Sequence, residues 1–187
     1  MTDLTRAAGD PPDRAGGTVV VTTVASDSHT WNLVFLQLLL EELGFDVVNL
    51  GPCVPDDLLV RHCREIRPTA VVISSVNGHG AQDGLRAIRA LRADGLTADL
   101  PVAIGGKLGV DGGATSHADL LLAAGFDAVF EEGRDTLTAF HRFLNGLDTG
   151  GGTALAPDGD RVARPKKNLA GTDARPRRAA EQMGVPA

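Results

Sequence analysis

The feature that most constrains the fold of this chain is an alternation, repeated five times, between short β-branched apolar runs and longer segments of helical periodicity. The apolar runs occupy 18–24, 45–50, 69–75, 100–104 and 127–130, and the helical segments occupy 32–43, 55–66, 82–93, 116–124 and 134–145. Strands that are apolar along their whole length are buried on both faces, and parallel strands joined by helices need right-handed crossovers. The alternation therefore predicts a parallel sheet with helices on both of its faces.

Turn-forming residues separate these segments. Gly44 follows the first helical segment, where a helix commonly ends, and a Gly-Pro pair follows the second strand. Pro55 lies at the first turn of the next helix, and the two aspartates after it suit the positive start of a helix dipole. The fold class that we predict is α/β, a flavodoxin-like (Rossmann-like) three-layer αβα sandwich whose five-stranded parallel sheet has the order 2-1-3-4-5.

The two ends of the chain differ in composition from the part between them. Residues 1–17 are rich in Pro, Gly, Ala and Asp and lack apolar periodicity, so we expect a flexible lead-in. Residues 149–187 open with a glycine run and carry prolines and basic residues, so we expect a disordered tail, with a docking arm for an acidic partner as the alternative. Residues 18–148 form one predicted domain of ordinary size.

Composition argues against several classes of function. The net charge is −6 and aromatic residues make up 4% of the chain, whereas nucleic-acid binding favours clustered basic residues and stacking rings. No apolar run reaches the roughly 20 residues of a membrane span, and residues 1–17 lack the apolar core of a signal peptide. We expect a cytoplasmic protein that binds neither nucleic acid nor a membrane.

Three loops, at 26–32, 74–80 and 105–109, follow the first, third and fourth predicted strands, at the sheet edge where such folds bind ligands. In the first loop Asp27 and His29 are two residues apart, so the carboxylate can accept the N–H of one imidazole nitrogen and leave the other free as a base or metal ligand. One histidine is a poor site for a bare metal ion, but it is adequate where a macrocycle supplies the equatorial ligands. The alternative is that Asp27 caps the next helix and His29 is a solvated loop residue.

The spacing of these loops resembles the signature of cobalamin-binding domains, which carry Asp-x-His-x-x-Gly, then Ser-x-Leu, then Gly-Gly. Residues 27–32 match the first block except that Asn32 replaces the glycine. Forty-one residues separate Asn32 from Ser74, Val76 stands for the leucine of the second block, and 28 residues lead on to Gly105 and Gly106. Both long spacings are similar to those of the family.

The resemblance implies a role for each matching residue. His29 would be the lower ligand of the cobalt in place of the cofactor's own dimethylbenzimidazole, with Asp27 hydrogen-bonded to its other ring nitrogen. Ser74 would hydrogen-bond the displaced base in a slot lined by Val76, and the glycine pair would let the nucleotide tail pass close to the backbone. The cofactor-binding set implied in this way is Asp27, Ser28, His29, Thr30, Asn32, Ser74, Val76, Asn77, Gly105 and Gly106, with His29 as the metal ligand.

Within that family the chain looks most similar to the small subunits of glutamate mutase, through residues 44–51 and 74–80. The resemblance implies an isomerase subunit that is inactive alone and has no catalytic residue of its own. It would present adenosylcobalamin to a separate (β/α)8-barrel subunit, which holds the substrate and rearranges L-glutamate to 3-methylaspartate. Asn32 for glycine, Val76 for leucine and Asn77 for tyrosine depart from the family pattern.

Other functions use the same fold. A methyl-transferring corrinoid carrier would have a helical domain ahead of the cobalamin domain, for which residues 1–17 are too short. A cobalamin-binding regulatory protein, or a divergent homologue with weakened cofactor binding, is favoured by Asn32 and by the basic tail. A phosphorelay receiver needs an acidic pair after the first strand and an aspartate at the end of the third, where this chain has Asp27 alone and Ser74.

Overall fold

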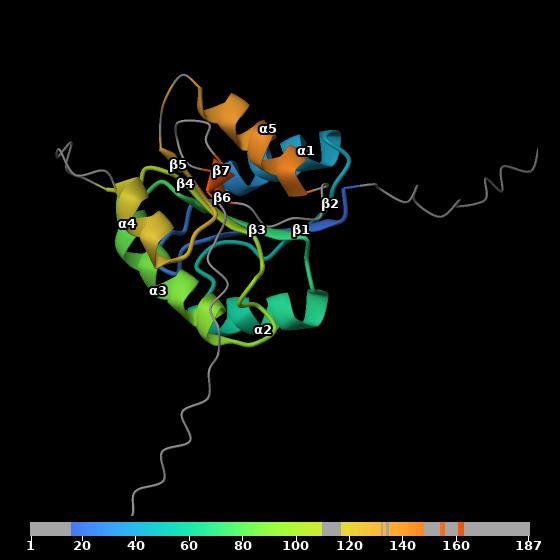
Figure 1. The fold of residues 1–187 in the computed structure, drawn as a ribbon. Helices are drawn as coiled ribbons and strands as arrows, with labels where there is room; N and C mark the ends of the chain where they lie inside the picture. The colour runs from blue at the N-terminus through green and yellow to red at the C-terminus, as the bar shows by residue number, and fades with distance from the viewer. Residues whose placement is uncertain are drawn as a thin grey trace, which may run out of the picture.

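Five parallel strands form the centre of the part of the chain that the computed structural model describes, namely residues 16–109, 117–131, 133, 135–147, 154–155 and 161–162. They are β1 (Thr18–Thr23), β2 (Asp46–Asn49), β3 (Ala70–Ser75), β4 (Val102–Gly106) and β5 (Ala128–Glu131). Their order in the sheet is β2-β1-β3-β4-β5 and every neighbouring pair is parallel. The predicted flavodoxin-like sheet and its strand order are confirmed (Figure 1).

Helices cover both faces of this sheet (Figure 1). α1 (Trp31–Glu42) and α5 (Thr136–Leu147) lie over one face. α2 (Asp56–Ile66), α3 (Gly80–Ala93) and α4 (His117–Ala124) lie over the other. The three-layer αβα sandwich predicted from the alternating segments is therefore confirmed.

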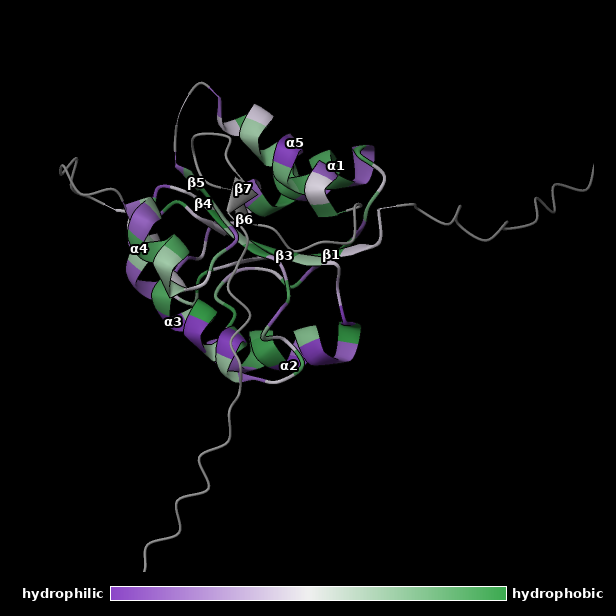
Figure 2. Ribbon diagram, in the orientation of Figure 1, coloured by the Kyte–Doolittle hydropathy of each residue, from purple (hydrophilic) through white to green (hydrophobic). Residues whose placement is uncertain are grey.

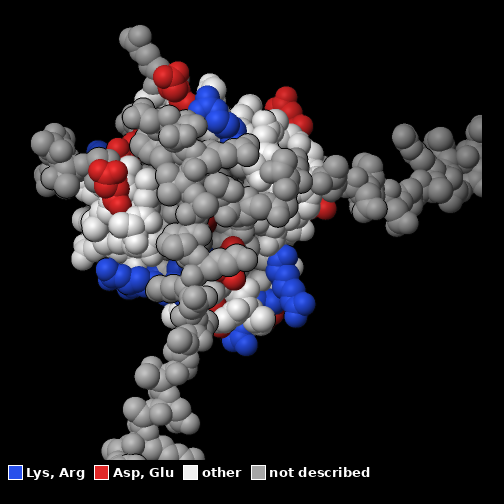
Figure 3. All heavy atoms as spheres, in the orientation of Figure 1, with Lys and Arg blue, Asp and Glu red and all other residues white. Residues whose placement is uncertain are grey.

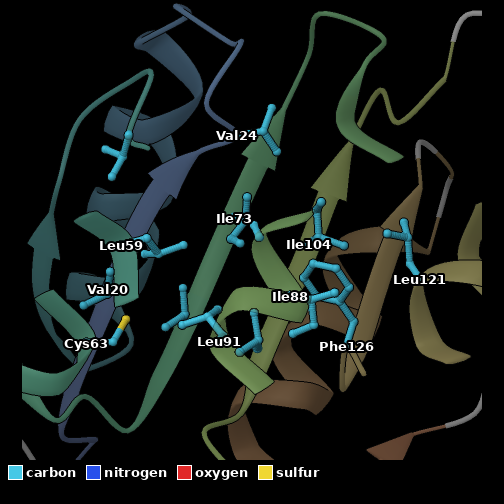
Figure 4. Packing of buried hydrophobic residues seen from close by; sticks show 14 of the residues in the cluster. Val20, Val24, Leu59, Cys63, Ile73, Ile88, Leu91, Ile104, Leu121 and Phe126 are labelled. Carbon is cyan, nitrogen blue, oxygen red and sulfur yellow. The ribbon is translucent and has the colours of Figure 1, made fainter. Parts of the chain in front are cut away.

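Each face of the sheet has its own apolar core, because successive side chains of a strand point to opposite faces. On β3, Val71 and Ile73 face the core beneath α2, α3 and α4, whereas Val72 faces the core beneath α1 and α5. Figure 4 shows the first of these cores, with Ile73 beside Ile104 at its centre. The hydropathy colours show hydrophobic strands at the centre and outer helices that carry both hydrophobic and hydrophilic residues (Figure 2).

Arg92 of α3 cross-links the amino edge of the sheet. Its guanidinium donates to the Oδ2 of Asp127, just before β5, at 2.9 Å. It also donates to the backbone oxygens of Leu100 at 2.7 Å, Thr97 at 3.2 Å and Gly125 at 2.8 Å. The same Asp127 oxygen accepts the N–H of Val102, the first residue of β4. One half-buried side chain thus joins α3 to the starts of β4 and β5.

Several element boundaries differ from the sequence prediction. Pro55 is the N-cap of α2 rather than a member of its first turn. α3 begins at Gly80, two residues before the predicted start, because the two added residues, Gly80 and Ala81, are small and contribute little to an apolar pattern. β4 continues through Gly105 and Gly106, which pair with Ser74 and Ser75 of β3, so the glycine pair ends the strand rather than following it.

The two predicted tails lie largely outside the described residues. Of the lead-in at 1–17, only Gly16 and Gly17 are described. Of the tail at 149–187, only the backbone of β6 (Ala154–Leu155) and β7 (Arg161–Val162) is described, and these two short strands pair antiparallel. The predictions of a flexible lead-in and a disordered tail therefore stay predictions.

Charged side chains are dispersed on the face shown in Figure 3, and the basic ones visible there lie mainly over α2 and α3. In that region Arg86 of α3 pairs with Asp83 at 2.9 Å and with Asp56 of α2. Among the helices of the described ranges, none has the length and apolar character needed to cross a membrane.

Two adjacent leucines of α4 test the packing of this layer. Leu121 is fully buried against the sheet, whereas Leu120 is 51% exposed. We expect Leu121→Ala to lower the free energy of unfolding by about 2–5 kcal/mol, because it removes buried methyl groups and leaves a cavity. Leu120→Ala is the matched control and should change it by less than about 0.5 kcal/mol. Urea denaturation of both variants measures the difference, and equal effects would contradict the assigned packing.

Candidate functional site

Three loops meet at the carboxyl edge of the sheet because β1, β3 and β4 are neighbours in it. Thr23 of β1 pairs with Ser74 of β3, and Ser74 pairs with Gly105 of β4, so the three strands end in one row. The β1–α1 loop, the β3–α3 loop and the start of the segment after β4 leave the sheet from this row. The prediction that the three loops share one edge is confirmed.

The fully buried carboxylate of Asp27 ties the first two loops together. Its Oδ1 accepts the backbone N–H of His29 at 3.0 Å and lies 2.6 Å from Nδ1 of the same residue. Its Oδ2 accepts the backbone N–H groups of Val76 at 2.6 Å and Asn77 at 3.2 Å. One side chain therefore holds two loops and an imidazole ring in fixed relative positions.

Two opposing effects act on the pKa of Asp27. Burial works to raise the pKa, because the charged form loses its hydration, but the N–H groups of Val76 and His29 and the His29 ring stabilise the carboxylate. The net result is a pKa of Asp27 below its ordinary value. Because the ionised carboxylate can only accept hydrogen bonds, we assign the ring proton of His29 to Nδ1.

The other ring nitrogen of His29, Nε2, is not used in the contact with Asp27. The side chain is 48% exposed, and within the described part of the chain Nε2 has no hydrogen-bond partner. Asp27 does not cap α1, since Thr30 is the N-cap residue and no side chain caps this helix. The capping role that the alternative gave to Asp27 is therefore wrong, whereas His29 is an exposed loop residue as the alternative expected, with its ring held by Asp27. A neutral imidazole held through Nδ1 has the lone pair of Nε2 available as a base or a metal ligand.

The described ranges contain no group of three or more His, Cys, Asp and Glu side chains that could hold a metal ion. A structural or catalytic zinc ion takes at least three protein ligands. Within these ranges, His29 and its neighbour Asp27 therefore do not make a zinc site of that kind.

Asn32 and Ser74 form a buried pair between α1 and β3. The Asn32 Nδ2 donates to the Ser74 Oγ at 2.7 Å, and the two residues are 5% and 7% exposed. Among the residues that the structure describes, the buried Oδ1 of Asn32 has no hydrogen-bond partner, whereas nearly all buried polar atoms have one. The hydroxyl of Ser74 is thus already engaged by a side chain of this chain.

A second polar network, which the sequence did not reveal, holds the β3–α3 loop. The Asn77 Nδ2 donates to the backbone oxygen of Ser26 at 3.1 Å and to its Oγ at 3.0 Å. The Ser26 hydroxyl in turn donates to the buried carboxylate of Asp83, which also accepts from Arg86 at 2.9 Å. Asp83 lies on the buried side of α3, where the helical periodicity predicts an apolar residue. A charged residue at such a position is the sequence signal from which this network could have been predicted.

The protein's own packing requires the Gly105–Gly106 pair. A Cβ at Gly106, where φ is +104°, would lie 2.2 Å from the backbone oxygen of Ser75. A Cβ at Gly105 would lie 3.0 Å from both the Cβ and the backbone oxygen of Phe130. Contacts between strands therefore explain both glycines, and the pair gives no independent sign of a ligand.

The other predicted site residues lie at the same edge with fewer contacts. Ser28 and Thr30 are exposed beside His29, and the half-buried Val76 contributes its N–H to Asp27. His79 is exposed at the start of α3, where its backbone N–H donates to the Oδ1 of Asn77 and its backbone oxygen accepts from the N–H of Asp83. The structure thus places the sequence-predicted residues along one sheet edge, with direct side-chain contacts within the pairs Asp27–His29 and Asn32–Ser74.

Comparisons with known proteins agree with this architecture. The family model for the B12 binding domain matches residues 17–141. Glutamate mutase sigma subunit 2 of Haloarcula marismortui is 31% identical over 119 residues, which are 63% of this chain and 79% of that protein. The glutamate mutase sigma subunit of Halobacterium salinarum is 34% identical over 116 residues, covering 60% and 75% of the two chains.

Among solved structures, a cobalamin-binding protein from Desulfitobacterium hafniense DCB-2 superposes with a TM-score of 0.53 at 28% identity. The match covers 67% of this chain and 58% of that one, so this chain spans just over half the length of that protein. The likeness supports the fold of the described domain.

The Asp27 carboxylate gives a testable prediction for stability. Asp27→Asn replaces one accepting oxygen with an NH2 group that faces N–H donors, so we expect the free energy of unfolding at neutral pH to fall by about 2–3 kcal/mol. The lowered pKa of Asp27 makes its contribution complete above the ordinary aspartate pKa of about 3.9, and the contribution is lost as pH falls through the lower folded-state value. Denaturation at a series of pH values should therefore show the difference between wild type and variant shrinking in acid.

The matched control is Ser28→Ala, an exposed neighbour in the same loop. It should leave stability unchanged at every pH. A deficit of Asp27→Asn that is independent of pH would contradict an ionised, hydrogen-bonded Asp27.

Proposed function

The chain belongs to the family of B12-binding domains that includes the glutamate mutase sigma subunits, and we propose that it binds cobalamin with His29 as the lower ligand of the cobalt. The observation that carries this proposal is the pairing of Asp27 with Nδ1 of His29 at 2.6 Å, on a half-exposed side chain whose Nε2 has no hydrogen-bond partner among the described residues. A carboxylate behind a ligating imidazole fixes its tautomer and raises the basicity of the other nitrogen.

The residues at this edge fit a corrinoid in their donor chemistry. A corrin ring supplies the equatorial nitrogens of its cobalt, so one exposed imidazole is sufficient protein ligation. Ser28 and Thr30 are exposed on either side of His29 and are proposed to contact the ring. Ser74, Val76, Asn77, Gly105 and Gly106 complete the proposed cofactor-binding set at the ends of β3 and β4, and Asn32 is its member on α1.

We extend the proposal to a reaction class. When bound, adenosylcobalamin would supply the cobalt–carbon bond whose cleavage starts a carbon-skeleton rearrangement, here that of L-glutamate to 3-methylaspartate. The role of this chain is then to hold and orient the cofactor through His29 and Asp27. This proposal is supported by the sequence identity of 31% and 34% with two proteins named glutamate mutase sigma subunit.

The substrate would be held by a separate catalytic subunit with a (β/α)8 barrel, and this chain would be inactive alone. A surface suited to a partner begins two residues after His29, on the outer side of α1. Its exposed apolar side chains recur at helical spacing, and they are Trp31, Val34, Phe35 and Leu38. A contiguous exposed apolar patch of this kind marks an interaction surface, and a partner that covers His29 would reach its first residue.

Isotope labelling tests the cobalt ligand directly. The chain is produced with heavy nitrogen (¹⁵N), loaded with unlabelled cobalamin and reduced to the cob(II)alamin state. If His29 ligates the cobalt, the EPR superhyperfine pattern changes from the triplet of ordinary nitrogen to a doublet. His29→Ala should restore the triplet of the cofactor's own base and weaken binding by about tenfold or more.

His79→Ala is the matched control, since His79 is an exposed histidine on the neighbouring loop. It should keep the doublet. A triplet in the labelled wild-type chain would refute ligation by His29.

Reconstitution tests the mutase assignment. This chain with adenosylcobalamin should not convert L-glutamate, and addition of a purified glutamate mutase catalytic subunit should produce 3-methylaspartate. Leu38→Glu, which puts a charge into the apolar surface of α1, should raise the concentration of this chain needed for half-maximal activity by about tenfold. Leu120→Glu, on the exposed side of α4, should not change it. Activity of the isolated chain, or equal effects of both variants, would count against this assignment.

A further inference from the structure

Asn32 of α1 contacts the hydroxyl of Ser74 on β3. Ser74 is the only residue of β3 whose hydroxyl lies on the sheet face that α1 and α5 cover. Val72 and Ser74 alternate with Val71 and Ile73 along β3, so Ser74 points to the same face as Val72. There the Ser74 Oγ accepts from Asn32 at 2.7 Å, and 7% of the serine is exposed. A ligand therefore cannot reach this hydroxyl unless the Asn32 side chain moves.

Aromatic side chains pack on the same side of the sheet, two strands away from Ser74. Phe130 lies beside Gly105 in the sheet, and its ring packs edge-on against Phe140 at 5.3 Å and Phe143 at 6.1 Å between centroids. Both phenylalanines of α5 are buried. A planar base inserted between the sheet and this helical layer would have to displace Asn32 or separate packed rings.

We propose that Asn32 is a specificity-determining residue that excludes the nucleotide base from the Ser74 position, so that this chain selects corrinoids by the ring and its lower ligand position. The inference rests on the proposed function, because it assumes that a corrinoid binds at His29. It concerns a residue that departs from the family motif, since asparagine stands where the motif has glycine.

The buried Oδ1 of Asn32 has no hydrogen-bond partner among the described residues, which indicates that this side chain is not present for stability alone. A buried carbonyl without a donor costs free energy, so the Asn32 side chain is not optimised for stability alone. Removing the amide loses the bond to Ser74 but also removes the unsatisfied oxygen. Variants at this position should therefore remain folded, and their ligand binding can be measured.

The experiment compares two corrinoids and two proteins. Visible absorbance titrations of the full chain give dissociation constants for aquocobalamin, which carries the nucleotide base, and for diaquocobinamide, which lacks it. The comparison is repeated with Asn32→Gly, which restores the motif glycine. We expect the variant to bind aquocobalamin about tenfold or more tightly than wild type, with binding of diaquocobinamide changed by less than about twofold.

Two further variants make the result specific. Asn32→Ala removes the amide but keeps a helix-forming residue, and it should shift aquocobalamin binding in the same direction as Asn32→Gly. Asn145→Gly, an exposed asparagine of α5, is the matched control and should change neither constant.

The outcomes separate the two proposals. An unchanged ratio of the two dissociation constants in both Asn32 variants, or an equal change for both corrinoids, overturns the role of Asn32 while leaving cobalamin binding in place. Weaker binding of both corrinoids in His29→Ala, together with a ratio shifted in favour of aquocobalamin in the Asn32 variants, supports both proposals. Absence of binding of either corrinoid to wild type and to all Asn32 variants overturns the proposed function, and this inference with it.

Discussion

The carboxylate of Asp27 is the constraint on which the rest of the ligand edge depends. A buried charge is tolerated only where hydrogen bonds replace its hydration, and Asp27 obtains them from two loops that are far apart in sequence. The donors on the second loop are backbone N–H groups, those of Val76 and Asn77. The side chains at these two positions can therefore differ from the family pattern without loosening the link between the loops.

The fold could be predicted from the sequence because fully buried parallel strands leave an unmistakable run of β-branched apolar residues, as in 69–75. The pairing of Asp27 with His29 could be predicted because it is local. The contacts of Asp83 and the direction of the Asn32 side chain could not, since both depend on which strand and helix become neighbours. The glycine pair was assigned to the wrong local structure, because Gly105 and Gly106 belong to β4 and are required by its neighbours β3 and β5.

In our proposal, Asn32 alters the site without removing its centre. His29 and the hydroxyl of Ser74 would serve different parts of a corrinoid, and they lie on opposite sides of the first turn of α1 in sequence. Because the Asn32 side chain hydrogen-bonds Ser74 and not His29, a change at this position would act on one part alone. The motif would then describe two adjoining subsites in this chain.

The cross-link made by Arg92 has a consequence for how such a scaffold diversifies. It joins α3 to the starts of β4 and β5, at the end of the sheet opposite to His29. These bonds of Arg92 do not involve the loops of the ligand edge, and the bonds of Asp27 do not involve the amino edge. Exchanges of exposed loop side chains at the ligand edge can therefore change what the domain recognises while the amino edge keeps its bonds, so the two ends can diverge separately in evolution.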